Sequence, residues 1–197
     1  LYALDVYPPV PFTYPGERPN RADWAETIFE PNDELGWRTQ PREGSEDKEA
    51  GDGIRYLADE HGRRTGPGRR PPSECTRKIV VAGDSFMWGA EVRYEDTLAA
   101  MLERDIDGMR VENLAQPGFG LDQIVLSVEQ QGLETQPDLV VVGIYPHDMS
   151  RSLTAYRNDL GFNKPTFALR GDELVRLSAA DRPSALVPHH AGDAHLG

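Results

Sequence analysis

Near the middle of the chain, a serine lies just after a short apolar segment. The segment Lys78-Ile79-Val80-Val81-Ala82 ends at Gly83-Asp84, and Ser85 comes next. A β-branched run of this kind is typical of a buried parallel strand, and open α/β sheets bind ligands at the carboxyl ends of such strands. Gly83 lets the backbone turn sharply and leaves room for a substrate. The pattern therefore predicts a nucleophilic serine at the edge of a sheet.

Two later segments carry glycines or polar side chains where predicted strands end. Asn113-Leu114-Ala115-Gln116-Pro117-Gly118-Phe119-Gly120 offers glycine N–H groups at a helix start, and Tyr145-Pro146-His147-Asp148 offers polar side chains. In a parallel sheet, the loops over residues 83–89, 115–120 and 145–150 must gather at one edge. A serine with convergent N–H donors is the minimum for acyl transfer, because the serine attacks and the donors hold the oxyanion.

The elements that must position these loops alternate between strand and helix. Strands are predicted over residues 78–82, 110–114 and 138–145, and the last of these is the clearest buried strand. Helices are predicted after an Asp96 N-cap and over residues 121–132. Their predicted core faces are Leu98, Met101, Leu102 and Ile106 in the first helix, and Leu121, Ile124, Val125 and Val128 in the second. This order predicts an α/β fold in three layers, with a mostly parallel sheet, flanking helices and right-handed crossovers.

Two regions are predicted: an extended lead-in with short strands and loops over residues 1–77, and the α/β domain over residues 78–197. In the lead-in, residues 30–37 indicate a turn feeding a strand, residues 54–58 a second strand, and residues 59–62 another turn. Residues 63–72 are typical of a flexible connector. A hairpin is predicted near residues 166–177, around Arg170-Gly171-Asp172, and residues 178–197 carry no convincing element.

Charge and composition exclude several classes of function. The chain has 197 residues and a formal net charge of −12, which argues against binding to nucleic acid or to anionic membrane surfaces. The single cysteine, Cys75, cannot form an internal disulfide, and no segment reaches the roughly 18 apolar residues that cross a bilayer. The chain begins at Leu1, so membrane contact is expected only through a missing N-terminal anchor, with a periplasmic or secreted location as one alternative and a cytoplasmic one as the other.

Taken together, three segments resemble the first three sequence blocks of the SGNH/GDSL hydrolases. These blocks are Gly83-Asp84-Ser85-Phe86, Asn113 with Pro117-Gly118-Phe119-Gly120, and Val142-Gly143-Ile144-Tyr145-Pro146-His147-Asp148, in matching order over about residues 78–150. Pro31-Asn32-Asp33-Glu34-Leu35-Gly36-Trp37 also resembles the lead-in of bacterial relatives. The resemblance implies a flavodoxin-like hydrolase fold and a serine esterase without a cofactor, acting on an ester of a carbohydrate, a lipid or a small metabolite.

The resemblance also implies the roles of individual residues. Ser85 would be the nucleophile and a backbone oxyanion donor, and Gly118 would supply a second N–H. The family usually has Asn where this chain has His147, and an imidazole N–H can also donate to an oxyanion. The family's last block, Asp-x-x-His, supplies the general base, but Gly192-Asp193-Ala194-His195 has its acid two places before the histidine. We therefore expect the domain to be incomplete at its C-terminus, with the base beyond Gly197 or, alternatively, at His195.

Other interpretations of the same residues stay open. A degenerate relative would keep the sheet and pocket and bind a ligand or a protein without turnover, and Gly118-Phe119-Gly120 is similar to half of a dinucleotide fingerprint. His147 could be a solvated loop residue, Asp84 a cap of the following turn, and Trp88 either a pocket wall or a packing residue. No predicted element fixes the C-terminal group, so we predict no metal site; the group is His189, His190, Asp193 and His195.

Overall fold

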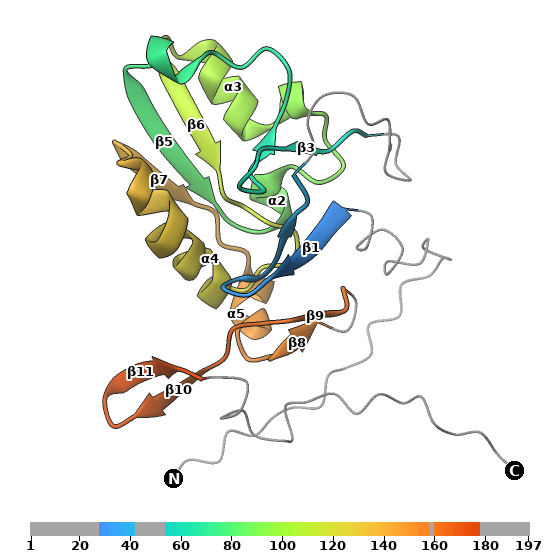
Figure 1. Ribbon diagram of the computed structural model, residues 1–197, viewed down its shortest axis with the longest axis vertical. Helices are drawn as coiled ribbons and strands as arrows, with labels where there is room; N and C mark the ends of the chain where they lie inside the picture. Colours follow the sequence, from blue (N-terminus) through green and yellow to red (C-terminus); the bar gives the residue numbers. More distant parts are fainter. Residues whose placement is uncertain (1–27, 42–53, 158–159, 178–197) are drawn as a thin grey trace, which may run out of the picture.

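A three-stranded parallel sheet lies at the centre of the fold (Figure 1). The computed structural model describes residues 28–41, 54–157 and 160–177. The central strand pairs in parallel with a neighbour on each side, in the order β6-β5-β7. The bounds are β5 (Arg77–Ala82), β6 (Met109–Asn113) and β7 (Leu139–Val142). The predicted α/β class with a parallel sheet is thereby confirmed.

Helices cover both faces of this sheet, because successive side chains of a strand point to opposite faces. Ile79 and Val81 of β5 pack with Ala99 of α3, whereas Val80 and Ala82 pack with Ile124 of α4. The α-helices are α2 (Ser85–Trp88), α3 (Leu98–Asp105), α4 (Leu121–Ser127) and α5 (Pro146–Arg151). The shorter turns are η1 (Pro72–Glu74), η2 (Tyr94–Asp96), η3 (Val128–Gly132) and η4 (Leu133–Thr135), of which η3 is π-helical.

Helix α3 differs from its prediction in its cap and in its buried face. Its N-cap is Thr97, whose hydroxyl accepts the N–H of Ala100 at 3.3 Å, so the predicted cap at Asp96 is wrong by one residue. Leu98 and Met101, predicted to face the core, are exposed. Leu102 and Ile106 are partly buried against the core cluster as predicted, and the fully buried positions of this helix are Ala99 and Glu103. Ala99 is small and Glu103 is charged, so a search for apolar periodicity does not find these two positions.

Helix α4 is shorter than predicted and turns a different face inward. It ends at Ser127, and η3 continues the path to Gly132 as a π-helical turn. Ile124 is buried as predicted, but Val125 is exposed, so that part of the predicted stripe is wrong. Gln123 takes one of the buried places, because its side chain bonds to the loop before the helix and to the turn between β1 and β2.

Strand β7 lies within the predicted range of residues 138–145, but it is shorter than predicted and lacks the predicted burial. Leu139, Val142 and Ile144 are all exposed, although a continuous aliphatic run is typical of a strand covered on both faces. Its edge position alone does not account for this exposure, because β6 at the other edge of the described sheet is mostly buried. Among the described residues, no helix has the length and apolar character needed to span a bilayer.

In the described part of the chain, four antiparallel strand pairs accompany the central sheet. They are β1 (Phe29–Asn32) with β2 (Gly36–Thr39), β3 (Leu57–Ala58) with β4 (Arg64–Thr65), β8 (Tyr156–Arg157) with β9 (Phe162–Asn163), and β10 (Phe167–Arg170) with β11 (Glu173–Arg176). The last pair is a hairpin around Gly171-Asp172, where the sequence predicts one. In Figure 1 it extends away from the central sheet. Gly62 donates to Asp59 O at 2.9 Å, which forms the turn predicted at residues 59–62.

The prediction of a flexible connector over residues 63–72 is wrong. Arg64 lies in strand β4 with only 1% of its surface exposed. Its guanidinium carbon lies 4.8 Å from the ring centroids of both Tyr56 and Trp88, and its Nη1 donates to Trp88 O at 2.9 Å. Cation–π contact and carbonyl acceptors replace the lost hydration of the cation. Trp88 is therefore a packing residue, fully buried, and not a pocket wall.

The described part of the lead-in shares a hydrophobic cluster with the sheet. Phe29 and Trp37 belong to the same buried cluster as Val80 and Phe119. The Trp37 ring lies 5.4 Å from Phe119 and 6.0 Å from Phe162, measured between centroids. Segments on both sides of the predicted boundary thus pack together, and the division at residue 78 stays a prediction.

Candidate functional site

Ser85 begins helix α2 directly after strand β5. Gly83 has a φ of +157°, and a Cβ there would lie 2.9 Å from Gly143 O, so this turn needs glycine. The Ser85 side chain is half-buried. Within the described residues its Oγ has no hydrogen-bond partner, which leaves the hydroxyl available to a substrate or a base.

The loops after the three parallel strands lie together at one edge of the sheet. Gln116 N–H donates to Gly83 O at 3.1 Å, and Gly143 N–H donates to Ala82 O at 2.9 Å. The Tyr145 ring lies 5.2 Å from the ring of Phe86, the residue after Ser85. The loops therefore converge as a parallel sheet requires.

Gly118 lies in the second loop in a conformation that favours glycine. Its φ is +82°, and a Cβ there would come within 3.0 Å of Leu160 and 3.1 Å of Arg157. Its carbonyl accepts a hydrogen bond from the Arg157 guanidinium. In the described part of the chain, neither its N–H nor that of Ser85 donates to any acceptor. Since buried N–H groups are nearly always paired, the buried Gly118 donor is suited to a bound acceptor.

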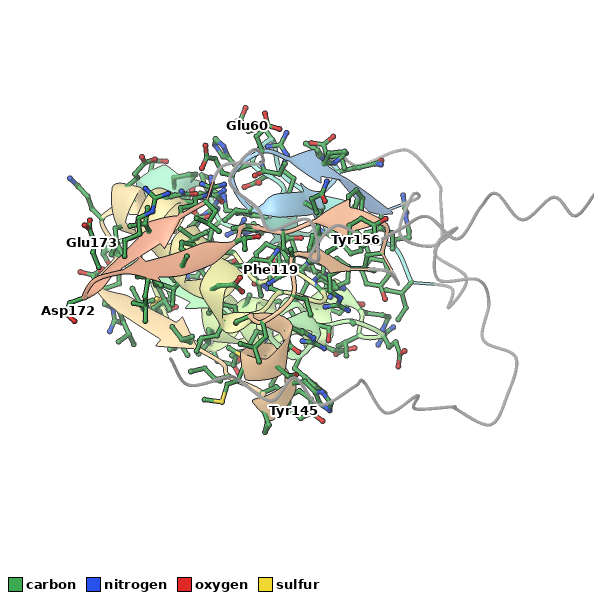
Figure 2. All side chains as sticks on the ribbon, turned by 90° about the horizontal axis from the view of Figure 1, so that it is seen from below. Glu60, Phe119, Tyr145, Tyr156, Asp172 and Glu173 are labelled. Atoms are coloured by element: carbon green, nitrogen blue, oxygen red, sulfur yellow. The ribbon has the colours of Figure 1, made fainter. Side chains whose placement is uncertain are left out.

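The second loop is anchored to the lead-in by buried polar contacts. Trp37 Nε1 donates to Pro117 O at 3.1 Å, and the hydroxyl of Thr39 donates to Gln116 Oε1 at 2.7 Å. Gln123 Nε2 donates to the carbonyl of Leu35 at 2.6 Å. Figure 2 shows Phe119, in this loop, well inside the molecule, and Tyr145 at its periphery. The sequence gives no signal for these anchors, because their partners lie about 80 residues away in the chain.

His147 is exposed in the first turn of α5. Its ring lies 5.3 Å from that of Tyr145, and no hydrogen bond joins it to Ser85. His61, the other histidine in the described ranges, is also exposed and lies 3.5 Å from Glu60. The C-terminal group of His189, His190, Asp193 and His195 lies outside the described residues. No histidine in residues 28–41, 54–157 and 160–177 thus holds Ser85 as a general base would.

Two buried aspartates cap the helices that follow β5 and β7. Asp84 Oδ1 accepts the Phe86 N–H at 3.0 Å, so Asp84 caps the turn after β5, which is one of the interpretations that the sequence leaves open. Asp148 Oδ2 accepts the Tyr145 N–H at 2.8 Å at the start of α5. The two side chains are 2% and 0% exposed. Each therefore fixes the backbone beside a candidate site residue.

Arg151 joins these two aspartates through a single nitrogen atom. Its Nη1 donates to Asp148 Oδ1 at 2.7 Å, to Asp84 Oδ2 at 3.1 Å and to Phe119 O at 3.3 Å. Burial raises the pKa of Asp148, and the neighbouring Asp84 raises it further, whereas the Tyr145 N–H and Arg151 oppose the shift. The residues predicted for the site do not include Arg151, although an aspartate three residues before an arginine in one helix is the spacing of an ion pair.

The raised pKa of Asp148 predicts a pH-dependent effect of Asp148→Asn. Burial favours the neutral acid, so the folded chain keeps this proton to higher pH than the unfolded chain. The protonated Asp148 carboxyl therefore makes its full contribution to the unfolding free energy of the wild type at pH values below 3.8, the ordinary pKa of an aspartate. This contribution falls as the pH rises through the pKa of Asp148 in the folded chain. We expect the unfolding free energy of Asp148→Asn, relative to wild type, to rise over that window and then level off. Urea unfolding at a series of pH values, followed by circular dichroism, measures this difference.

The matched control for that experiment is Asp172→Asn, which changes an exposed carboxyl at the tip of the β10–β11 hairpin. A relative stability of Asp148→Asn that falls with rising pH would contradict the prediction. It would mean that the bond to Arg151 outweighs burial in setting the ionisation of Asp148.

Lys164 links α4 and α5 through an ion pair and a hydrogen bond. Its Nζ lies 2.9 Å from both Asp122 carboxylate oxygens and donates to Arg151 O at 3.0 Å. The side chain is fully buried, and this burial lowers the pKa of Lys164 while Asp122 opposes the shift. The hydrogen bond from Lys164 to the backbone carbonyl of Arg151 is a second contact that holds Arg151 in place.

A cavity of about 330 Å³ lies elsewhere in the molecule. None of its lining residues belongs to the three loops, and they include Arg69, Tyr94 and Glu103. Burial raises the pKa of Tyr94 to about 12, so its phenol stays protonated at neutral pH. Within the described ranges, no group of three or more metal-ligating side chains comes together.

Comparison with known proteins gives the chain no family. No family model matches it, and no curated protein is significantly similar to it. The functional assignment therefore depends on the loops around Ser85 and on their geometry.

Proposed function

We propose that the chain is a serine ester hydrolase of the SGNH/GDSL type, with that family's flavodoxin-like fold. The observation that carries the proposal is that, within the described residues, the Ser85 hydroxyl and the backbone N–H groups of Ser85 and Gly118 have no hydrogen-bond partner. All of them lie where parallel strands end, and the loops that carry them are hydrogen-bonded to each other. A nucleophile and preorganised donors are what acyl transfer requires.

In the proposed reaction, Ser85 Oγ attacks the carbonyl carbon of an ester. The N–H groups of Ser85 and Gly118 donate to the oxyanion that forms, and the imidazole of His147 is the third donor. The alcohol then leaves, and water hydrolyses the acyl-serine. A histidine outside the described residues acts as the general base. The proposed substrate is an ester of a carbohydrate, a lipid or a small metabolite.

A second candidate function is a degenerate domain that binds a ligand or a protein without turnover. The observation that favours it is the lack of a hydrogen bond from either described histidine, His61 or His147, to Ser85. An unactivated serine is a poor nucleophile, so this domain would keep the loops but not the reaction.

A fluorophosphonate probe separates the two candidates. We expect covalent labelling of the native chain, mapped to Ser85 by peptide mass spectrometry, and no labelling of Ser85→Ala or of heat-unfolded protein. The probe reports an activated serine without the identity of the natural ester. If native protein remains unlabelled, the hydrolase proposal fails and the binding domain is the better assignment.

A further inference from the structure

We propose that Arg151 is the positioning residue of this site, holding the loops of Ser85, Gly118 and His147 in register through one guanidinium nitrogen. This inference rests on the proposed function, since it assigns Arg151 a part in the reaction of Ser85. Arg151 would not touch the substrate. It would act through the two aspartates and the carbonyl that it contacts.

The geometry behind this proposal is the same at two of the three loops. Each aspartate uses one carboxylate oxygen to accept the N–H at the start of a helix and the other to accept Arg151 Nη1. Asp84 thereby fixes the turn of Ser85, and Asp148 fixes the turn of His147. The third acceptor, Phe119 O, follows Gly118 directly. One atom thus has a contact in each loop.

The negative charges of Asp84 and Asp148 explain why the Arg151 guanidinium is needed. Asp84 and Asp148 are both buried, and Arg151 is 23% exposed. Without the guanidinium, two buried carboxyl groups would face each other with no cation, and like charges at close range disfavour the ionised pair. Breaking a buried ion pair by removing one partner leaves an uncompensated charge. The two carboxyl groups would then move apart, or one of them would take up a proton. Either change would displace the proposed oxyanion donors.

Such a displacement should affect the rate of reaction more than substrate binding. The proposed oxyanion donors must lie within about 0.5 Å of the productive geometry, and a shift of about 1 Å can cost about 10²-fold in rate. Because Arg151 Nη1 bonds to Asp84, Asp148 and the Phe119 carbonyl, it would act through these groups, so loss of the residue should lower kcat and leave KM nearly unchanged.

The test compares wild type with Arg151→Met, Arg151→Lys and Arg104→Met. Arg104 is an exposed arginine paired with Asp105, so it controls for loss of a surface guanidinium. For each protein, the rate of fluorophosphonate labelling at Ser85 is measured, together with hydrogen exchange of the Phe86 and Tyr145 amides. We expect Arg151→Met to label about 10²-fold more slowly, to lose protection at both amides, and to regain part of the rate with added methylguanidinium. Arg104→Met should match wild type.

Arg151→Lys keeps the test decisive if Arg151→Met does not fold. All three bonds converge on one nitrogen, and the lysine ammonium group also carries three N–H donors. This variant should therefore keep the exchange protection of both amides and label faster than Arg151→Met. Labelling of Arg151→Met at the wild-type rate would overturn the inference while leaving the hydrolase proposal intact. Slow labelling with both amides still protected would overturn it as well. If wild type is not labelled, the hydrolase proposal fails, and the exchange data alone decide whether Arg151 holds the loops.

Discussion

Ser85→Ala is expected to lower kcat/KM for a chromogenic short-acyl ester by about 10³-fold or more. The reason is that the Oγ of Ser85 is the atom that would form the bond to the carbonyl. The free energy of unfolding should change by less than about 0.5 kcal/mol, since this half-buried hydroxyl has no hydrogen-bond partner in the described ranges. A large loss of activity without a loss of stability is the signature of a nucleophile. Steady-state kinetics and urea unfolding of the same samples measure both.

Ser73→Ala is the matched control for this substitution. Ser73 is an exposed serine in η1, outside the three loops, so its removal should change neither quantity. Equal rates for wild type and Ser85→Ala would show that any measured hydrolysis comes from another group or from a contaminant. In that case the proposed nucleophile would be wrong, whatever the activity of the preparation.

Trp37→Ala is expected to lower the unfolding free energy by about 3–5 kcal/mol. Trp37 is fully buried, packs against the rings of Phe119 and Phe162, and donates its indole N–H to Pro117 O. The substitution leaves a large cavity and an unpaired carbonyl beside Gly118. Urea unfolding followed by far-ultraviolet circular dichroism measures the effect without depending on tryptophan fluorescence.

Trp37→Phe divides this effect into its two parts. Phenylalanine keeps most of the apolar contact but loses the hydrogen bond, so a loss of about 1–3 kcal/mol is expected from the unpaired Pro117 carbonyl. Esterase activity measured where this variant is folded should also fall, because the second loop loses an anchor. A loss below about 1 kcal/mol in Trp37→Ala would contradict the shared core of the lead-in and the sheet.

The parallel sheet could be predicted because its signal is local. The run Ile79-Val80-Val81-Ala82 and the run Leu139-Val140-Val141-Val142 both end at polar loops, and this pattern alone places Ser85 and His147 at one edge. The burial of the second run could not be predicted in the same way. Exposure of a strand depends on which elements pack on its two faces, and the strand's own residues carry no record of those elements.

The interior polar contacts of the site were beyond sequence reasoning for a related reason. Arg64 lies in a stretch rich in glycine, proline and arginine, and its burial depends on rings at Tyr56 and Trp88 that only the fold brings around it. Arg151 has a local signal, the aspartate three residues before it, but its two other acceptors belong to distant segments. Spacing along the chain can therefore suggest the bond between Arg151 and Asp148, but it cannot show that three acceptors meet at one nitrogen of Arg151.

The contacts between the lead-in and the second loop also bear on the order of folding. Trp37 and Pro117 are 80 residues apart, and Leu35 and Gln123 are 88 apart. Contacts of such long sequence separation form late, because a long chain segment must be ordered before they can stabilise anything. During synthesis the lead-in therefore emerges well before its partners. The loop that carries Gly118 can reach its final form only when both parts of the chain have met.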